Sequence, residues 1–171
     1  MIRNERPEFV KAPSSSNLED IARDYNEAFK NGFDLSTEEI ATYLGVTDRW
    51  IARHLHEGIK YRYINSLARR ALAKYGDKNF KHLYTYKKKI FHRKAWQTHL
   101  LQHSFIEADD GSLLPIEKLP KELISCTEAA AKYNITRPTF YKYTKGKATK
   151  YVVYELKRYS SREIELLLLD L

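Results

Sequence analysis

STEEIATYLGVT, at residues 36–47, matches SCTEAAAKYNIT, at residues 125–136, without a gap and at a constant offset of 89 residues (125 minus 36). Each stretch has the pattern of a short helix, a tight turn and the start of a second helix. Gly45 and Asn134 stand at the same place in the two copies, and these residue types best tolerate a left-handed turn. The match therefore predicts a helix-turn-helix that occurs twice in the chain.

The composition is that of a soluble globular protein. The chain has 171 residues, enough for one compact domain or two small ones, with 43% hydrophobic and 30% charged residues. No apolar run approaches the roughly 18–20 residues that a membrane span needs, and the first residues lack the apolar core of a secretory signal. A single cysteine, Cys126, excludes an internal disulfide and suits a reducing compartment. We therefore expect a cytoplasmic protein that does not bind membranes.

The net charge of +8 is concentrated in one part of the chain. Residues 60–94 contain twelve Lys and Arg and one acid, Asp77, whereas the first forty residues contain nine acids and five bases. Such concentration is typical of a surface that binds a polyanion. A solvated basic helix is the alternative interpretation, but the position directly after a helix-turn-helix favours phosphate contact.

The first repeat is expected to span residues 17–106, after an N-terminal arm at residues 1–16 that is predicted to be flexible. A capping box and an apolar stripe at helical spacing predict a helix at residues 17–30. After the helix-turn-helix, the pattern indicates a basic helix at about 61–75 that has no counterpart in the second repeat. A strand at 83–91 and a helix at 93–103 complete this repeat.

Residues 107–122 form the predicted linker, and residues 123–171 form the second repeat, with a strand region at 150–159 and a final helix. Residues 151–159 lack the Gly or Asn that a two-residue hairpin prefers, which favours one long strand over a tight wing. The strand regions of the two repeats are then expected to pair and to join the halves into an internal pseudo-dimer. The predicted fold class is mainly α with small β (α+β), with two winged helix-turn-helix repeats.

The second helix of a helix-turn-helix lies in the major groove of DNA and presents its first residues to the base edges. In the first repeat Arg49 and Arg53 are four residues apart and share the face opposite Ile51 and Leu55, which are expected in the core. Each arginine can contact guanine, with roughly 1–3 kcal/mol of discrimination. Trp50 fits either the edge of the core or a contact with the DNA backbone.

Thr47 and Thr136 are predicted N-caps of the two second helices, where they can also touch phosphate. In the second repeat Arg137, Tyr141 and Lys142 are the candidates for the exposed, DNA-facing side. Basic residues in and beside the strand regions suit phosphate clamping, which positions a protein without specifying sequence. These residues are Lys87, Lys88, Lys89, Lys147, Lys150, Lys157 and Arg158.

Residues 126–143, CTEAAAKYNITRPTFYKY, and residues 158–167, RYSSREIELL, resemble the excisionase and MerR-type winged helix-turn-helix family. That family runs from a helix-turn-helix through a short β wing to a helix that opens with Ser-Arg-Glu. The first repeat is similar, with KIFHRKA at residues 89–95 in the closing position. The resemblance implies a winged fold and the binding of double-stranded DNA.

Two such modules in one small basic chain also resemble the DNA-binding accessory proteins of Gram-positive conjugative plasmids. This resemblance implies a regulator or accessory factor of a mobile element, such as a conjugative plasmid, a phage or an integrative element. It also implies protein partners in a mobile-element complex. With two heads on one chain, a monomer is expected to cover two half-sites about one helical turn, roughly 34 Å, apart.

Other functions have weaker support in the sequence. His99 and His103 are four residues apart, with His92 nearby, but no cluster of Cys or carboxylates accompanies them at the spacing of a zinc site. There is no Walker loop, no Gly-rich dinucleotide turn and no recognisable setting for a nucleophile. We therefore expect no metal, no cofactor and no enzyme activity. The remaining alternative is a protein-interaction and assembly module whose basic surface docks an acidic partner.

Overall fold

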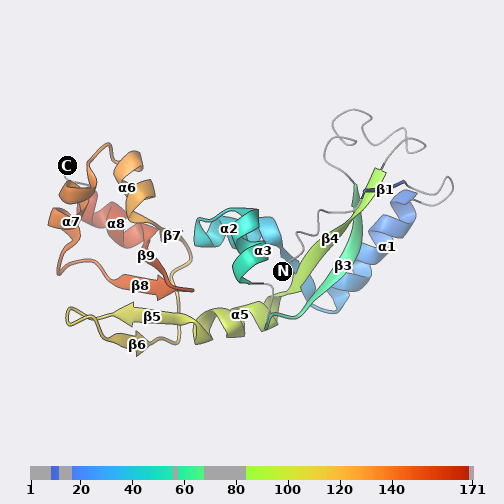
Figure 1. Cartoon of the computed structure of the whole chain (residues 1–171), viewed down its shortest axis with the longest axis horizontal. Helices are drawn as coiled ribbons and strands as arrows, with labels where there is room; N and C mark the ends of the chain where they lie inside the picture. The colour runs from blue at the N-terminus through green and yellow to red at the C-terminus, as the bar shows by residue number, and fades with distance from the viewer. Residues whose placement is uncertain (1–8, 12–16, 56–57, 68–83, 170–171) are drawn as a thin grey trace. The chain divides into compact units, whose positions relative to one another are not determined.

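A computed structural model describes residues 9–11, 17–55, 58–67 and 84–169 (Figure 1). The described residues form an α+β structure that divides into two compact units. Unit 1 comprises Met1–Thr37 and Ile59–Lys94, and unit 2 comprises Glu38–Gly58 and Ala95–Leu171. This division cuts across the two expected repeats, because the first helix-turn-helix region belongs to the same unit as the second repeat. None of the described helices has the length and apolar character of a membrane span.

Unit 1 contains an antiparallel sheet centred on β4 (Tyr84–His92). β3 (Tyr61–Leu67) pairs with β4 along most of its length. β1 (Phe9–Lys11) pairs with the start of β4, and β2 (Phe33–Ser36) pairs with its end. The helix α1 (Asn17–Lys30) lies between β1 and β2 in the chain, and it confirms the helix that the capping box and the apolar stripe predict.

The core of unit 1 lies between α1 and one face of this sheet. Ala28 of α1 packs with Phe33, Ile64 and Ile90, and Tyr25 packs against this cluster. Residues two apart in a strand share a face, so the face that carries Ile64 and Ile90 is the one that α1 covers. The opposite face carries the alternate residues of β3 and β4.

The helix expected at about residues 61–75 is wrong where the structure describes it, because residues 61–67 form strand β3. Successive side chains of this segment point to opposite faces, as in a strand. Tyr61 and Tyr63 are exposed on one face, and Ile64 is buried on the other. Pairing with β4 satisfies the backbone donors and acceptors of this segment. Residues 68–75 of the expected helix lie outside the described residues. The strand expected at 83–91 is confirmed by β4.

Unit 2 carries two pairs of short helices, each joined by a tight turn. The first pair is α2 (Thr37–Leu44) with α3 (Asp48–His54), and the second is α6 (Cys126–Lys132) with α7 (Arg137–Thr144). These are the helices that the repeated stretch predicts. α5 (Arg93–Gln102) precedes the second pair in the chain, as expected, and α8 (Ser161–Leu168) follows it.

The strands of unit 2 form one antiparallel arrangement in the order β6-β5-β8-β9-β7. Their bounds are Ser104–Glu107 for β5, Leu113–Pro115 for β6, Leu123–Ile124 for β7, Lys150–Val153 for β8 and Leu156–Ser160 for β9. β6 lies within the segment that was expected to be a linker. That segment therefore extends the sheet through the β5–β6 hairpin.

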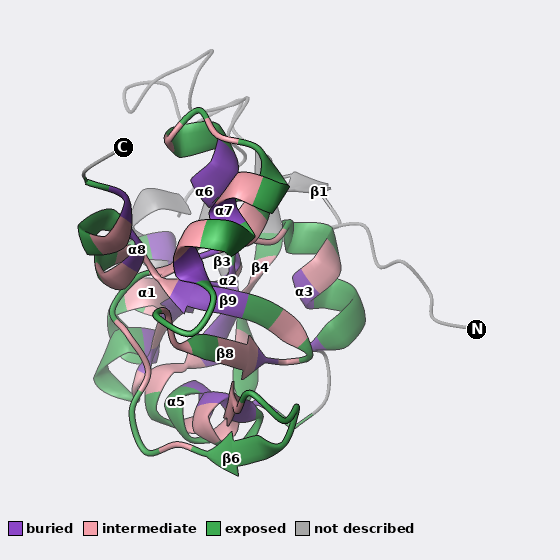
Figure 2. Ribbon diagram, turned by 90° about the vertical axis from the view of Figure 1, so that its left-hand side faces the viewer, coloured by how far each residue is buried: buried purple, intermediate pink, exposed green. Residues whose placement is uncertain are grey.

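The core of unit 2 gathers the inner faces of its second helix pair, of α8 and of the sheet. Phe140 of α7 and Ile164 of α8 are fully buried in one cluster with Ala129 and Tyr159. Figure 2 shows the result on α7 and α8, each of which has buried and exposed sides. Ile51 and Leu55 of the first pair are buried as well, which confirms their expected positions.

The single long strand expected at residues 150–159 is wrong. β8 and β9 are joined by a two-residue turn in which Tyr154 and Glu155 have φ of 48° and 66°. Two positive φ values at the centre of a hairpin are typical of a type I′ turn, which favours Asn and Gly. Here a tertiary contact holds the turn, since the Tyr154 ring stacks on His99 and His103 and its N–H donates to the His103 carbonyl at 3.0 Å.

The pairing expected between the strand regions of the two repeats is also wrong for the part of the chain that the structure describes. β4 pairs with β1, β2 and β3, whereas β8 pairs with β5 and β9. A strand has two edges, and both edges of β8 are occupied within unit 2. The described strands therefore do not join the two repeats in the way that the expected pseudo-dimer requires.

Candidate nucleic-acid interface

The turn between α6 and α7 positions the second candidate recognition helix. Asn134 takes up the left-handed conformation with φ of 52°, and the Ile135 N–H donates to the Ala130 carbonyl at 3.0 Å. Thr136 then caps α7, because its hydroxyl accepts a hydrogen bond from the Thr139 N–H at 3.3 Å. These local features are the ones that the sequence predicts at this place.

α7 separates its core residues from its polar ones. Phe140 and Thr144 are buried, whereas Arg137, Tyr141 and Lys142 are exposed, as expected. Tyr141 keeps 48% of its surface in solvent. The hydrogen bond with the side chain of Cys126 is the main cause that raises the pKa of Tyr141, and burial adds to it. The exposed side of α7 therefore presents two cations and a phenol, groups that bind phosphates and base edges.

The region after α7 extends this basic surface. Lys147 is exposed in the turn that follows the helix, and Lys150 and Lys157 are exposed on the β8–β9 hairpin. Val152 pairs with Lys157 and lies two residues from Lys150, so both lysines share one face of the hairpin. From Lys132 to Lys157 the chain carries seven Lys and Arg and a single acid, Glu155, a net charge of +6.

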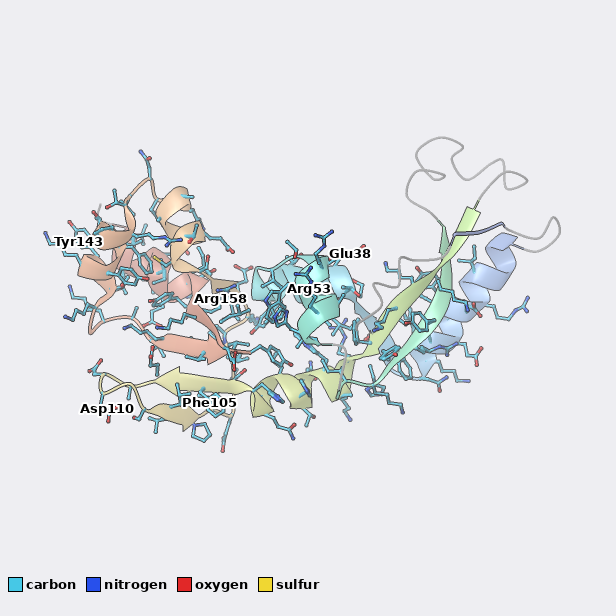
Figure 3. The ribbon with its side chains drawn as sticks, viewed as in Figure 1. Glu38, Arg53, Phe105, Asp110, Tyr143 and Arg158 are labelled. Atoms are coloured by element: carbon cyan, nitrogen blue, oxygen red, sulfur yellow. The ribbon has the colours of Figure 1, made fainter. Side chains whose placement is uncertain are left out.

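Arg158 does not belong to that surface, and its expected role as a phosphate clamp is wrong. The side chain is buried, and its Nε and Nη2 donate to the carbonyls of Leu44 and Gly45 at 2.8 and 3.5 Å. Burial lowers the pKa of Arg158, an effect that the nearby Glu128 opposes. In Figure 3 the side chain extends from β9 toward α2. Alternation in β9 explains the difference, since Lys157 and Arg158 point to opposite faces.

The first candidate recognition helix, α3, has the predicted cap and the predicted exposed arginines. Thr47 accepts a hydrogen bond from the Trp50 N–H at 3.1 Å. Arg49 and Arg53 are exposed, and Figure 3 shows Arg53 on this helix. Trp50 is half-buried, and its ring stacks on His54 with centroids 4.3 Å apart.

The two helix pairs differ in charge. Residues 37–55 contain three acids, Glu38, Glu39 and Asp48, and two arginines, a net charge of −1. The first helix pair therefore has little of the phosphate-binding charge that surrounds α7. Its candidate contacts with DNA are the two arginines of α3.

The three lysines of β4 do not form one clamp. Lys87 and Lys89 share a face with Tyr61 and Tyr63 of β3, whereas Lys88 lies on the opposite face with Ile64. The Lys89 ammonium lies 4.0 Å from the centroid of the Tyr61 ring. All three lysines belong to unit 1, while α3 and α7 belong to unit 2.

The histidines of α5 take part in a stack of rings. The rings of His99 and His103 are 4.2 Å apart, and His99 Nδ1 lies 2.7 Å from the Tyr154 hydroxyl. Burial, and then the neighbouring His103, lowers the pKa of His99. Among the described residues, no group of three or more His, Cys, Asp or Glu side chains is arranged to hold a metal ion.

No family model, curated protein or solved structure matches this chain. The candidate interface therefore rests on the geometry of its own residues. The sequence did not predict the hydrogen bonds of Arg158 to α2 or the stacking of Tyr154 on the α5 histidines. The partners are distant in sequence, so the local pattern carries no signal of them. It also missed the exposure of Tyr61 and Tyr63, although their alternation with Arg62 and Ile64 could have indicated it.

Proposed function

We propose that the chain binds double-stranded DNA through two winged helix-turn-helix modules, with α7 in the major groove as the principal contact. The observation that carries this proposal is the exposed basic surface of α7 and the β8–β9 hairpin. Arg137, Tyr141 and Lys142 on the helix are exposed, and in this proposal they contact bases and phosphates. Lys147, Lys150 and Lys157 on the following segments are exposed as well, and in this proposal they contact phosphates.

The order of the elements supports a winged module. In the second repeat β7, α6, α7, β8 and β9 follow one another, and β9 lies between β7 and β8. In the first repeat β2, α2, α3, β3 and β4 follow one another, and β4 pairs with both β2 and β3. The two repeats thus share one sequence of elements and one pattern of strand pairing, as the resemblance to excisionase and MerR-type proteins implies.

The difference in charge between the two modules indicates different roles in DNA binding. α7 and its hairpin supply most of the phosphate contacts, because residues 132–157 have a net charge of +6. α3 supplies sequence discrimination through Arg49 and Arg53, with a smaller electrostatic share. The biological role that fits two linked readers is that of a regulator or accessory factor of a mobile element.

The test begins with selection of duplex fragments by the purified full-length protein at physiological salt, followed by sequencing. One enriched site with two spaced half-sites is the expected result. Binding of that site is then measured against salt concentration for the parent protein and for the Arg137→Ala/Lys142→Ala variant. The slope of log K against log salt is negative, and each lost phosphate contact reduces its magnitude by about 0.9.

Lys118→Ala is the matched control, since Lys118 is an exposed lysine of the same unit outside the proposed interface. It is expected to leave the slope and the affinity unchanged. Parent-like binding by the Arg137→Ala/Lys142→Ala variant would show that α7 does not contact DNA. Failure of the parent to retain any duplex would reject the proposed function and leave a protein partner as the alternative.

A further inference from the structure

The sheet of unit 1 has a second face, and that face is aromatic and basic. Tyr61 pairs with Phe91 and Tyr63 pairs with Lys89, which puts these four residues on the face opposite the α1-covered one. Lys87, two residues before Lys89, shares it. Phe91 is buried, so the exposed aromatic residues of this face are Tyr61 and Tyr63. Figure 1 shows α1 alongside this sheet. The sheet residues that pack against α1, Ile64 and Ile90, lie on the face opposite the tyrosines.

The two tyrosines of this face are both exposed to solvent. Tyr61 is 39% exposed and Tyr63 is 45% exposed, and their rings meet edge to face with centroids 5.6 Å apart. Aromatic rings that are exposed next to each other can offer apolar area to a ligand. The two rings lie side by side on one strand and form a small platform.

The charged residues of the two strands that form this platform are all basic. β3 and β4 together contain one arginine and three lysines and no acidic residue. Lys87 is exposed, and the Lys89 ammonium lies 4.0 Å from the Tyr61 ring centroid. A ligand that stacks on the rings therefore also meets cations, which points to an anion with flat, apolar faces.

We propose that this face of the unit 1 sheet binds single-stranded DNA. Its bases stack on Tyr61 and Tyr63, and its phosphates pair with Lys87 and Lys89. Aromatic platforms in a basic groove bind single strands in this way, with little sequence preference, because every base has a π-face. A duplex keeps its bases stacked inside the helix, so it can use the lysines but not the rings. The site goes beyond the proposed duplex contacts and involves none of their residues on α3 and α7.

The test uses the full-length protein and a fluorescent oligo-dT of about 20 nucleotides, with binding followed by fluorescence anisotropy. The Tyr61→Ala/Tyr63→Ala variant is expected to bind this strand at least tenfold more weakly, since each stacked base is worth roughly a fivefold to hundredfold change in affinity. Tyr61→Phe/Tyr63→Phe is expected to bind like the parent, because phenylalanine keeps the stacking face. Retained binding by this variant also separates loss of stacking from loss of folding.

Phe29→Ala is the matched control, because Phe29 is an aromatic residue of the same unit that is 48% exposed on α1. It is expected to leave the affinity for oligo-dT unchanged. Failure of the parent to bind oligo-dT, or parent-like binding by the double alanine variant, would overturn the proposal. So would an equal loss of oligo-dT binding in Tyr141→Ala/Lys142→Ala, which would place the strand on α7. Duplex affinity is measured on the same variants, so a failure of the duplex function is seen separately.

Discussion

The guanidinium of Arg158 donates from Nε to the backbone carbonyl of Leu44 at 2.8 Å, across 114 residues of the chain. Leu44 is the last residue of α2, where carbonyls lack partners within the helix. A second donation reaches the Gly45 carbonyl at 3.5 Å, so one buried cation caps the C-terminal end of α2. β9 of the second repeat thereby holds the turn of the first helix pair inside unit 2.

Arg158→Ala is expected to lower the free energy of unfolding by about 2 kcal/mol, since buried hydrogen bonds to charged groups are worth ~1.5–3 kcal/mol. Urea unfolding followed by circular dichroism measures the change. Lys157→Ala is the control, because Lys157 is exposed and an exposed substitution alters stability by roughly 0.5 kcal/mol or less. Equal stabilities of the two variants would contradict a structural role for Arg158.

The β8–β9 turn predicts opposite effects for two neighbouring substitutions. Glu155→Gly is expected to raise the free energy of unfolding by about 0.5–1 kcal/mol. Glu155 is exposed and has a φ of 66°, a left-handed conformation that is strained for Glu and unstrained for Gly. Tyr154→Gly relieves the same strain but removes the stack on His99 and His103, so it is expected to lower stability. The melting temperatures of both variants are measured by thermal unfolding. A shift of the same sign in both would contradict the opposite effects expected here.

The His99 site predicts a pH dependence of stability. Because burial lowers the folded-state pKa of His99 below its ordinary value of 6.5, the unfolded chain takes up the proton first. The contribution of this site is therefore full above about pH 6.5 and decreases as the pH falls from there through the folded-state pKa. The titratable groups His103 and Tyr154 contact the ring, and burial raises the pKa of the Tyr154 hydroxyl above its ordinary value.

Urea unfolding of the parent and of His99→Gln at pH 7.5 and pH 5.5 tests this expectation. The parent is expected to lose more stability between the two pH values than the variant. An equal loss in both proteins would assign the pH dependence to other groups.

The exposed arginines of α3 predict a change in specificity more than in affinity. Arg49→Ala and Arg53→Ala are each expected to reduce discrimination in one half-site by roughly 1–3 kcal/mol if the arginine contacts guanine. Comparison of each variant on the selected site and on sites with single base changes measures this quantity. Unaltered discrimination would mean that α3 does not enter the groove.

The sequence by itself determined the two helix pairs. The predicted caps Thr47 and Thr136 each accept a hydrogen bond from an N–H three residues later, and Gly45 and Asn134 each adopt a positive φ. These features could be predicted because caps and tight turns depend on side chains within one helical turn. The same locality explains why helix α1 and the exposed residues of α7 were found, and with them most of the candidate duplex interface.

Tertiary structure alone decided where Arg158 points, how the β8–β9 turn forms and which strands pair. The Arg158 contact joins residues 114 apart, and the strained turn at Tyr154 is held by rings from α5. The pairing of β5 with β8 excluded the strand pairing that the repeat alone suggested. Each outcome depends on a partner distant in sequence, whose hydrogen bonds and buried area outweigh a local preference of about 1 kcal/mol.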